Sequence, residues 1–333
     1  MKIAIITGIT GQDGAYLSKF LLEKKYKIVG FVRSNDDYSK LEYLKIKNEI
    51  IFEKCDLLNL SEIIKNIQKY NPREIYNFAS QSSVSLSIKE PFQTLQFNII
   101  SVLNLLEAIR LIGKSIRFFQ ASSCEMFGKF QNIPTVENDF FKPLNPYAIS
   151  KVTAHQIVSN YRKLYGIFSC CAILFNHESY LRGEDFFVKK IVKQAVEIKF
   201  GKRDFLKVGN LDIKRDLGYA PRYIEAMWLM LQQSKAEDFV ISSGKSICLK
   251  DIVYYVFDKL GLKREKIIVD KDFFRKSDIP ETLGDNSKAK KVLGWDYEMD
   301  FYKVLDFLIS EEIDNQRLKY FKNKGIDEDF KSI

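Results

Sequence analysis

Histidine and cysteine are scarce in this chain of 333 residues. The two histidines, His155 and His177, do not stand in metal-ligand spacing, so we expect no zinc site. The five cysteines include no C-x-x-C pair and cannot all pair with one another. Three of them lie in apolar, strand-like stretches, the usual setting of reduced, buried thiols in a cytosolic protein. We therefore expect a cytoplasmic protein without a disulfide framework or a metal centre.

The chain also lacks features that would direct it to a membrane or to nucleic acid. No apolar run approaches the roughly 20 residues that a membrane span requires. The first residues, MKIAIITGITG, lead straight into a strand and a glycine turn, which is not the pattern of a signal peptide. The net charge is +9, but no basic run is long or interleaved with aromatic residues. We interpret this charge as lysines scattered over a solvated surface, with attraction to an anionic partner such as a nucleotide as the alternative.

What the chain does contain is an ordinary globular composition, with 46% hydrophobic and 29% charged residues, arranged as alternating strands and helices. Such alternation predicts an α/β fold, a doubly wound parallel sheet of the Rossmann type, over residues 1–175. A smaller C-terminal α/β lobe is expected over 176–320, with a return to the first domain around 210–245 and a charged tail over 321–333. The expected strands are 2–7, 27–32, 50–52, 74–78, 116–120 and 168–175, and the expected helices are 16–22, 60–70, 92–112, 147–165 and 187–200.

A glycine turn connects the first strand to the first helix. Its sequence, Gly8-Ile-Thr-Gly11-Gln-Asp-Gly14, has the G-x-x-G-x-x-G spacing. Glycines allow the backbone to turn tightly and to approach a pyrophosphate held at the helix N-terminus. The position of the turn between a strand and a helix predicts dinucleotide binding.

The end of the second strand bears on which dinucleotide is bound. An NAD site usually has an acidic residue there for the ribose hydroxyls, whereas the first charged residue here is Arg33. A guanidinium suits a 2′-phosphate, so we expect NADP. Asp36 and Asp37 follow closely, and NAD is the alternative. After the third strand, Asp56 is a candidate acceptor for the adenine amino group.

The stretch 120–151 holds the candidate catalytic residues. An apolar strand ends there in Ser123 and Glu125, and a helical pattern then begins that places Tyr147 and Lys151 four residues apart on one face. The reference pKa of tyrosine, about 10, makes it a poor base at neutral pH. An adjacent ammonium and the positive ring of an oxidised nicotinamide would stabilise the phenolate and lower that pKa. The pattern predicts an oxidoreductase-type site with a carboxylate beside the tyrosine.

Together, the glycine turn, the serine at the strand end and Y-x-x-x-K resemble the extended short-chain dehydrogenase/reductases. Over nearly the whole chain the sequence is more specifically similar to the GDP-mannose 4,6-dehydratase family. The segments that carry this resemblance are TGITGQDG (7–14), QASSCEMFG (120–128), NPYAISK (145–151), ILFNHES (173–179), GNLDIKRD (209–216) and GDNSKAKKVLGW (284–295).

The resemblance implies a role for each matching residue. Ser123 takes the place of the family's catalytic threonine, Glu125 of its glutamate, Tyr147 of its base and Lys151 of the partner of that base. The implied NADP contacts are Gly8, Thr10, Gly11, Gln12, Asp13, Gly14, Arg33, Asp56, Leu57, Phe78, Ala79, Ser80, Ser82, Tyr147, Lys151, His177 and Arg182. The implied GDP-sugar contacts are Ser83, Asn176, Lys189, Gly209, Arg215 and Arg275.

Glu125 separates the possible activities, because epimerases of this group carry small residues where dehydratases carry a carboxylate. The expected reaction is conversion of a GDP-hexose to its 4-keto-6-deoxy derivative, by a homo-dimer or homo-tetramer. The sequence departs from the family pattern at several places, for example at Ser80–Val84, where the family's histidine is missing. GDP-mannose, a GDP-heptose and an N-acetylated GDP-hexose therefore stay open as substrates. A nucleotide-sugar 4-epimerase or reductase and a silent NADP-binding protein are the rival interpretations.

Overall fold

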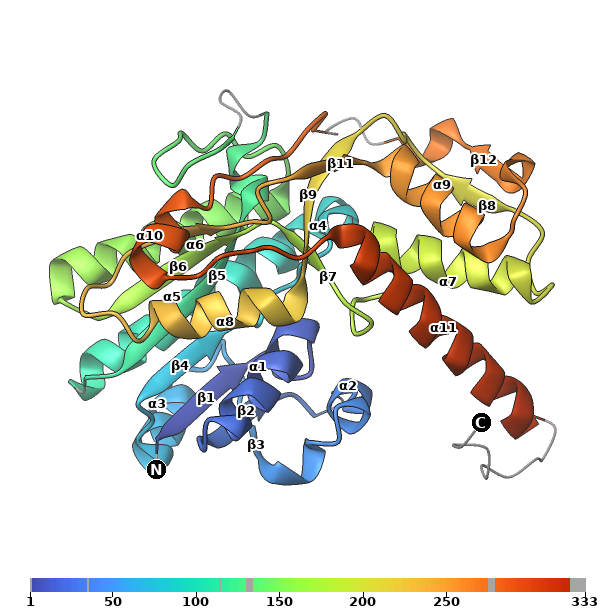
Figure 1. The fold of residues 1–333 in the computed structure, drawn as a ribbon. Helices are drawn as coiled ribbons and strands as arrows, with labels where there is room; N and C mark the ends of the chain where they lie inside the picture. Colours follow the sequence, from blue (N-terminus) through green and yellow to red (C-terminus); the bar gives the residue numbers. More distant parts are fainter. Residues whose placement is uncertain (1, 35, 114, 130–133, 275–278, 324–333) are drawn as a thin grey trace.

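The computed structural model describes residues 2–34, 36–113, 115–129, 134–274 and 279–323. Its centre is a seven-stranded sheet in the order β10-β6-β5-β4-β1-β2-β3, in which every neighbouring pair is parallel (Figure 1). The chain order reverses between β1 and β4, the position at which doubly wound sheets open a crevice at the carboxyl ends of their strands. The strands are β1 (Ile3–Thr7), β2 (Lys27–Val32), β3 (Ile50–Lys54), β4 (Glu74–Asn77), β5 (Arg117–Ser123), β6 (Ser169–Leu174) and β10 (Phe239–Ile241).

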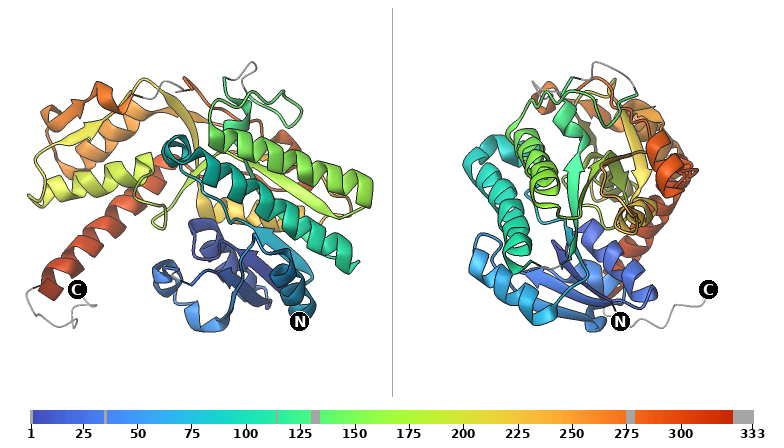
Figure 2. Two further views of the ribbon diagram at one scale, coloured as in Figure 1. Left: turned by 180° about the vertical axis from the view of Figure 1, so that it is seen from behind. Right: turned by 90° about the vertical axis from the view of Figure 1, so that its left-hand side faces the viewer.

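Helices cover both faces of this sheet (Figure 2), and apolar residues alternate along its strands to meet them. In β1, Ile5 packs with the helices of one face while Ala4 and Ile6 pack with those of the other. Parallel strands buried on both faces read as continuous apolar runs, which is how they appear in the sequence. One face carries α3 (Leu60–Tyr70), α5 (Pro91–Ile112) and α6 (Pro146–Tyr165), and the other carries α1 (Gln12–Glu23) and α8 (Ala220–Met230). This arrangement confirms the expected fold class.

A second apolar core lies in the C-terminal part of the chain, where α7, α9 and α11 pack around β8. Two small sheets accompany it, with strand orders β11-β9-β7 and β12-β8. The elements are β7 (Asn176–Glu178), α7 (Phe187–Lys199), β8 (Leu206–Val208), β9 (Lys214–Tyr219), β11 (Ser246–Cys248), α9 (Leu249–Leu260), β12 (Ile267–Val269) and α11 (Phe301–Asn323). Shorter helices are α2 (Ser39–Tyr43), α4 (Val84–Lys89) and α10 (Ser287–Leu293).

The two parts are interleaved along the chain. Helix α8, which follows β7 and β9 along the chain, packs against α1. Strand β10 then pairs with β6 at the edge of the main sheet. The expected tail over 321–333 begins within α11, which is helical to Asn323; the residues beyond it lie outside the described part of the chain.

Helix α5 corrects one expectation. By length and composition it could cross a membrane, although the sequence was expected to hold no such run. In the structure it packs against α3 and α6. One of its buried polar residues serves that packing, since the Asn98 amide donates to Ser150 Oγ on α6 at 2.9 Å. The apolar character of α5 thus contributes to the layer that covers the sheet.

Candidate functional site

The glycine turn lies at the carboxyl end of β1 and is closely packed against the next strand. Gly8 has φ +66°, and a Cβ there would come within 2.7 Å of the Ala79 nitrogen. A Cβ on Gly14 would lie 2.4 Å from the Gly8 carbonyl oxygen. Gly11 precedes α1 and supplies no side-chain cap, so no capping side chain occupies the N–H groups of the first helical turn. Thr10 is half-buried within the turn. The geometry is that of a site for an anionic group at a helix N-terminus.

Asp13, in the first turn of α1, is bound to His177 from β7. Both carboxylate oxygens of Asp13 lie 3.0 Å from His177 Nε2, while Nδ1 of the same ring faces the Phe175 carbonyl oxygen at 2.7 Å. Both ring nitrogens of His177 therefore face oxygen atoms. Burial alone would raise the pKa of Asp13, but the contacts with His177 and Gln12 outweigh it and lower that pKa to about 2. Ser179 Oγ also donates to Gln12 Oε1 at 2.7 Å, which ties the glycine-turn helix to the β7 segment.

Tyr147 and Lys151 lie on the first turns of α6 and are both buried. The Lys151 ammonium donates to the Ala121 carbonyl oxygen of β5 at 2.9 Å, and burial lowers its pKa to about 8. Burial raises the pKa of Tyr147, and the nearby Glu125 carboxylate adds to that rise, while a hydrogen bond with Ser123 acts in the opposite direction. Burial thus favours the protonated phenol, and the predicted lowering of the pKa requires the charge of an oxidised nicotinamide in addition to Lys151.

Glu125 lies on a 3₁₀ turn, Cys124–Phe127, that directly follows β5. Ser123 caps this turn, its Oγ accepting from the Glu125 N–H at 3.2 Å. The far end of the Glu125 side chain accepts a hydrogen bond from Asn145 Nδ2 at 3.3 Å. The structure thus brings together Ser123, Glu125, Tyr147 and Lys151 at the carboxyl end of one strand.

Hydrogen-bonded amides connect the neighbouring strand ends. Thr7 Oγ1 donates to Asn77 Oδ1 at 2.5 Å, and Asn77 Nδ2 donates to Gln120 Oε1 at 2.8 Å, which links β1, β4 and β5. In the loop after β4, Phe78, Ala79 and Ser80 are half-buried, whereas Ser82 is exposed. Ser83 caps α4 through its Oγ, which accepts from the Leu86 N–H at 3.2 Å. These residues surround the glycine turn from the side of β4.

Residues predicted at the ends of β2 and β3 occupy a more exposed edge. The side chain of Arg33 is 80% exposed, and its Nε lies 3.7 Å from Asp36 Oδ1. Asp56 is exposed and accepts from the Leu58 N–H at 2.9 Å, while Leu57 is buried and its carbonyl accepts from Asn104. Arg33 is thus accessible to a ligand, with an acidic neighbour already in contact.

The predicted residues of the lobe divide into two groups. Arg182 and Arg215 lie toward the site: the charge of Arg182 acts on both Asp13 and Tyr147, and that of Arg215 on Cys124. Asn176 begins β7, next to His177.

Lys189 and Gly209 belong to the second group. The Lys189 ammonium is buried, 3.2 Å from Glu312 Oε2 on α11 and over the Tyr180 ring. A Cβ on Gly209 would lie 2.8 Å from the Phe273 carbonyl oxygen, so close backbone packing accounts for this glycine. Arg275 lies outside the described residues.

A second polar cluster lies between the end of β5 and α6. Ser122 Oγ is 3.1 Å from His155 Nδ1, and His155 Nε2 is 3.7 Å from Asp238 Oδ2. The order of groups is that of a hydrolytic triad. Ser122 is buried, however, and Arg162 holds Asp238 through two hydrogen bonds. The cluster links β5, α6 and the segment before β10, and it offers no accessible nucleophile.

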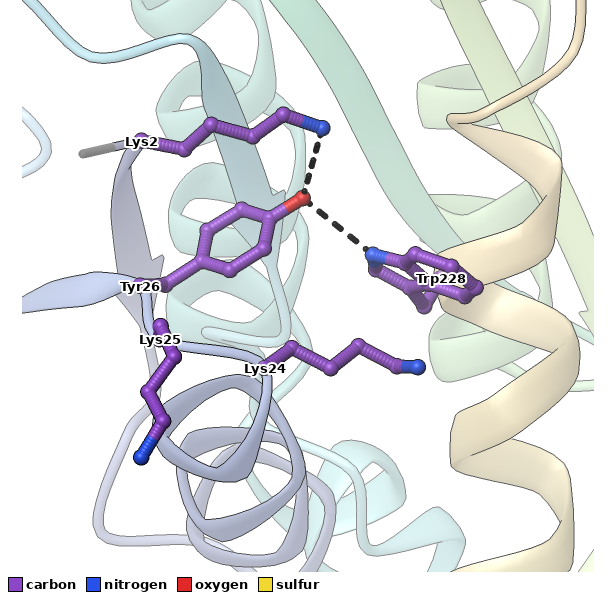
Figure 3. A pocket seen from close by; sticks show the side chains of 5 residues that line it. All are labelled: Lys2, Lys24, Lys25, Tyr26 and Trp228. Atoms are coloured by element: carbon purple, nitrogen blue, oxygen red, sulfur yellow. Dashed lines mark hydrogen bonds between the residues drawn. The ribbon is translucent and has the colours of Figure 1, made fainter.

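An open cavity of about 400 Å³ lies at the opposite end of the sheet, where its strands begin (Figure 3). It is lined by Lys2, Lys24, Lys25, Tyr26 and Trp228. The Tyr26 hydroxyl lies at its centre, 3.3 Å from Lys2 Nζ and 3.2 Å from Trp228 Nε1. Lys2 precedes β1, Tyr26 precedes β2 and Trp228 comes from α8, so the cavity lies where the strands begin and is separate from the Tyr147 cluster.

Comparison with known proteins identifies the family. The family model described as "GDP-mannose 4,6 dehydratase" matches residues 5–307. The chain belongs to this family. It is 39% identical to GDP-mannose 4,6 dehydratase 1 of Arabidopsis thaliana over 94% of this chain and 90% of that protein. It is 38% identical to the GDP-mannose 4,6-dehydratase of Yersinia enterocolitica over 89% of each chain.

Solved structures of low sequence identity share the fold of this family member. The dTDP-glucose 4,6-dehydratase DesIV of Streptomyces venezuelae, with NAD bound, has a TM-score of 0.85 at 17% identity, covering 95% of this chain and 98% of that one. RMD of Pseudomonas aeruginosa, complexed with NADPH, has a TM-score of 0.81 at 22% identity, covering 95% and 100%. UDP-glucose 4-epimerase of Thermotoga maritima has a TM-score of 0.84 at 21% identity, covering 95% and 99%. The same fold serves dehydratases and epimerases, so the activity must be argued from the site.

Sequence reasoning did not single out Asn145, whose amide contacts Glu125. A signal was present, because asparagine followed by proline is a common start of a helix, with the asparagine as cap and the proline in the first turn. The contact of Tyr223 with His177, stacked with ring centroids 4.9 Å apart, was also missed. No local pattern reveals it, because α8 reaches β7 only through the tertiary fold.

Proposed function

We propose that this chain is a GDP-sugar 4,6-dehydratase of the GDP-mannose type that uses NADP. The observation that carries the proposal is the position of Glu125, on the turn after β5 and close enough to Tyr147 to raise the pKa of that phenol. A tyrosine and a lysine alone suit hydride chemistry in general. A carboxylate next to them adds a base that can remove a second proton from the same sugar ring.

The glycine turn fits a dinucleotide. Gly8 has a positive φ and packs so closely against Ala79 that a side chain would clash there, and the N–H groups at the start of α1 are free of a side-chain cap. Residues that would hold NADP are the turn itself, the Phe78–Ser82 loop, the Asp56–Leu57 pair, His177 and Arg182. Arg33 would bind the 2′-phosphate. Asp36 lies beside it, and this acidic residue keeps NAD as the less favoured alternative. When bound, the oxidised nicotinamide supplies the hydride acceptor and a positive charge.

Tyr147 then acts on the C4 hydroxyl of the sugar. Its phenolate would take the hydroxyl proton while C4 gives up its hydride to the bound acceptor and becomes a ketone. Ser123 would stabilise the phenolate through the hydrogen bond that already lowers its pKa. Lys151 provides a charged group one helical turn away, held by the Ala121 carbonyl. Oxidation at C4 makes the C5 proton acidic.

Glu125 carries out the step that distinguishes a dehydratase. Its carboxylate takes the C5 proton and passes it to the C6 hydroxyl, which leaves as water. The hydride returns to C6, and the proton held by Tyr147 goes to C5. The sugar has lost one water, the product is a 4-keto-6-deoxy sugar nucleotide, and the cofactor is regenerated.

The two parts of the protein, each with its own apolar core, would bind different ligands. Residues 1–175, with α8 and β10, would bind NADP, and the lobe over 176–320 would bind the GDP-sugar through Asn176 and Arg215. Arg275 keeps the role given it by the family resemblance. Lys189 is the weakest of the substrate assignments, because Glu312 already holds its ammonium.

A homo-oligomer, dimer or tetramer, is supported by exposed apolar side chains on the α5–α6 face. Phe92 on α5 is 70% exposed and Leu164 on α6 is 72% exposed. Phe92 lies near the start of α5. Leu164 lies near the end of α6 with the exposed Tyr165, and Leu111 is exposed at the corresponding end of α5. An apolar group of this kind commonly marks an interface with a partner. The protein would act in the cytoplasm, without nucleic-acid or membrane partners.

The decisive experiment incubates the protein and NADP⁺ with a panel of GDP-, UDP- and CDP-sugars. We expect mass spectrometry to show loss of one water from a GDP-sugar, with GDP-mannose, a GDP-heptose and an N-acetylated GDP-hexose as the first candidates. The Glu125→Gln variant should bind the same substrate but lose water about 10²- to 10⁴-fold more slowly, the usual contribution of general acid–base catalysis.

Each rival function predicts a different result. A 4-epimerase would change the sugar without loss of mass, a reductase would consume reduced cofactor stoichiometrically, and a silent protein would bind NADP without turnover. Failure to dehydrate any GDP-sugar, or full dehydration by Glu125→Gln, would refute the proposed function.

A further inference from the structure

Asn145 stands between the two catalytic elements and uses both ends of its amide. The side chain is buried, with 5% of the residue exposed. Its Oδ1 accepts from the Ala148 N–H at 2.8 Å as the N-cap of α6. Its Nδ2 donates to Glu125 Oε2 at 3.3 Å. One side chain thus contacts both the start of the tyrosine helix and the carboxylate.

The cap fixes which end of the amide faces Glu125. Oxygen and nitrogen of an asparagine amide look alike in shape, so hydrogen bonds must decide its orientation. Only the oxygen can accept from the Ala148 N–H, so the NH₂ group necessarily faces the carboxylate. Pro146, the first helical residue, has no N–H that could compete for the cap oxygen.

The backbone of Glu125 is held separately. Its N–H donates to Ser123 Oγ, and its carbonyl accepts from the Gly128 N–H at 3.2 Å. A Cβ on Gly128, at φ +62°, would lie 1.8 Å from the Lys142 carbonyl oxygen, so the turn is closely packed against its neighbour. The backbone of the turn is therefore fixed. Asn145 restricts the Glu125 side chain, which the turn itself leaves free to rotate.

We propose that Asn145 is a positioning residue for the dehydration step, which directs the Glu125 carboxylate toward the sugar on the side of Tyr147. This inference rests on the proposed function. A donor to a carboxylate favours its charged form, and a fixed base loses less rate to misalignment. The distance of 3.3 Å is long for a hydrogen bond, as such contacts often are before substrate binds.

The test is the isosteric variant Asn145→Asp, which keeps the cap oxygen and replaces the NH₂ donor by a second carboxylate oxygen. We expect dehydration at neutral pH to fall about 10- to 100-fold, with little change in KM, because two carboxylates now face each other. At lower pH the pair would share one proton, which restores a donor to Glu125. The activity of the variant relative to wild type should therefore recover as the pH falls.

Separating the half-reactions makes the test specific. Oxidation at C4 is followed by the absorbance of reduced nicotinamide, and proton removal at C5 by deuterium uptake from solvent. In Asn145→Asp, reduced cofactor should accumulate while C5 exchange slows. Asn160→Asp, the same change on an exposed turn of the same helix, controls for the added charge and should behave as wild type.

The contrast with Asn145→Ala distinguishes positioning from capping. If Asn145 only caps α6, the alanine variant loses stability and both half-reactions together, while the aspartate variant matches wild type. That outcome, or equal loss of both half-reactions in Asn145→Asp, would overturn the inference. Absence of dehydration by the wild-type protein would instead refute the proposed function.

Discussion

The main sheet has a carboxylate that accepts several hydrogen bonds at each end of its strands. Asp13 lies where the strands end, which we call the carboxyl edge, and Glu74 lies where they begin, which we call the amino edge. Asp13 is bound by a histidine and by Gln12, and its charge reaches Lys151. Glu74 accepts from three neutral donors, the hydroxyls of Tyr26 and Tyr76 and the Gln232 amide.

The difference lies in what these contacts connect. At the amino edge they fasten β4 to the start of β2 and to the end of α8, and Trp228 and Lys2 complete the cluster around the Tyr26 hydroxyl (Figure 3). At the carboxyl edge the contacts hold groups whose charges act on one another across the glycine turn. Tyrosine, lysine and carboxylate occur at both edges, so residue type alone does not locate the chemistry.

The largest effect should come from Tyr147→Phe at the carboxyl edge. Removing the hydroxyl removes the acid–base group, and we expect kcat to fall about 10³-fold. The cost in stability should stay within about 1 kcal/mol, since one hydrogen bond is lost. Steady-state kinetics and thermal unfolding measure the two quantities. Tyr26→Phe is the matched change at the amino edge, and a comparable loss of kcat there would erase the distinction between the edges.

The reciprocal change at the amino edge is Glu74→Gln. Glu74 is buried, and an amide in its place presents an NH₂ group to donors that need an acceptor. We expect a loss of about 1–3 kcal/mol in the free energy of unfolding, with kcat per folded molecule unchanged. Denaturant unfolding checks the first value. A variant as stable as wild type would show that the Glu74 cluster is dispensable to the fold.

Asp13 makes the carboxyl edge sensitive to acid. Its pKa in the folded protein, about 2, is lower than the ordinary value of 3.8 expected in the unfolded chain. The pair with His177 therefore stabilises the fold above about pH 4, and this contribution, about 2 kcal/mol, is lost as the pH falls from 4 toward 2. Asp13→Asn should flatten that part of the stability profile, while the exposed Asp314→Asn should leave it as in wild type. Parallel profiles for wild type and Asp13→Asn would contradict the linkage.

The smallest effect should come from Lys24→Ala in the cavity of Figure 3. The Lys24 ammonium lies 4.1 Å from the Trp228 ring centroid and is exposed to solvent. Exposed cation–π contacts contribute about 0.5–1 kcal/mol, so the melting temperature should fall only slightly and kcat should not change. A marked loss of activity would assign this edge a functional role.

The sequence predicted the features that depend on local pattern. Apolar runs bounded by glycine turns indicated the parallel sheet, and the spacing from Tyr147 to Lys151 placed both on one helical face. The strands of the lobe were not assigned individually, because most, like β7 and β8, have three residues, too few to show a period.

Local sequence patterns do not predict contacts between residues that are far apart along the chain. Asp13 and His177 are 164 positions apart, and Lys189 meets Glu312 across 123 positions. Burial raises the pKa of Tyr147, and the prediction from the spacing of Tyr147 and Lys151 did not include this effect. How deeply a side chain is buried depends on the folded chain, and the spacing of residues in the sequence does not indicate it.

Strand β10 has a consequence for how the protein is made. It completes the edge of the main sheet beside β6, but the chain reaches Phe239–Ile241 only after all of β7, α7 and β9 has been synthesised. A ribosome that has released residues 1–175 has exposed a sheet whose β6 edge is still unpaired. Until α8 and β10 emerge, that edge remains open to pairing with other chains, so the nascent polypeptide should depend most on chaperones during this interval.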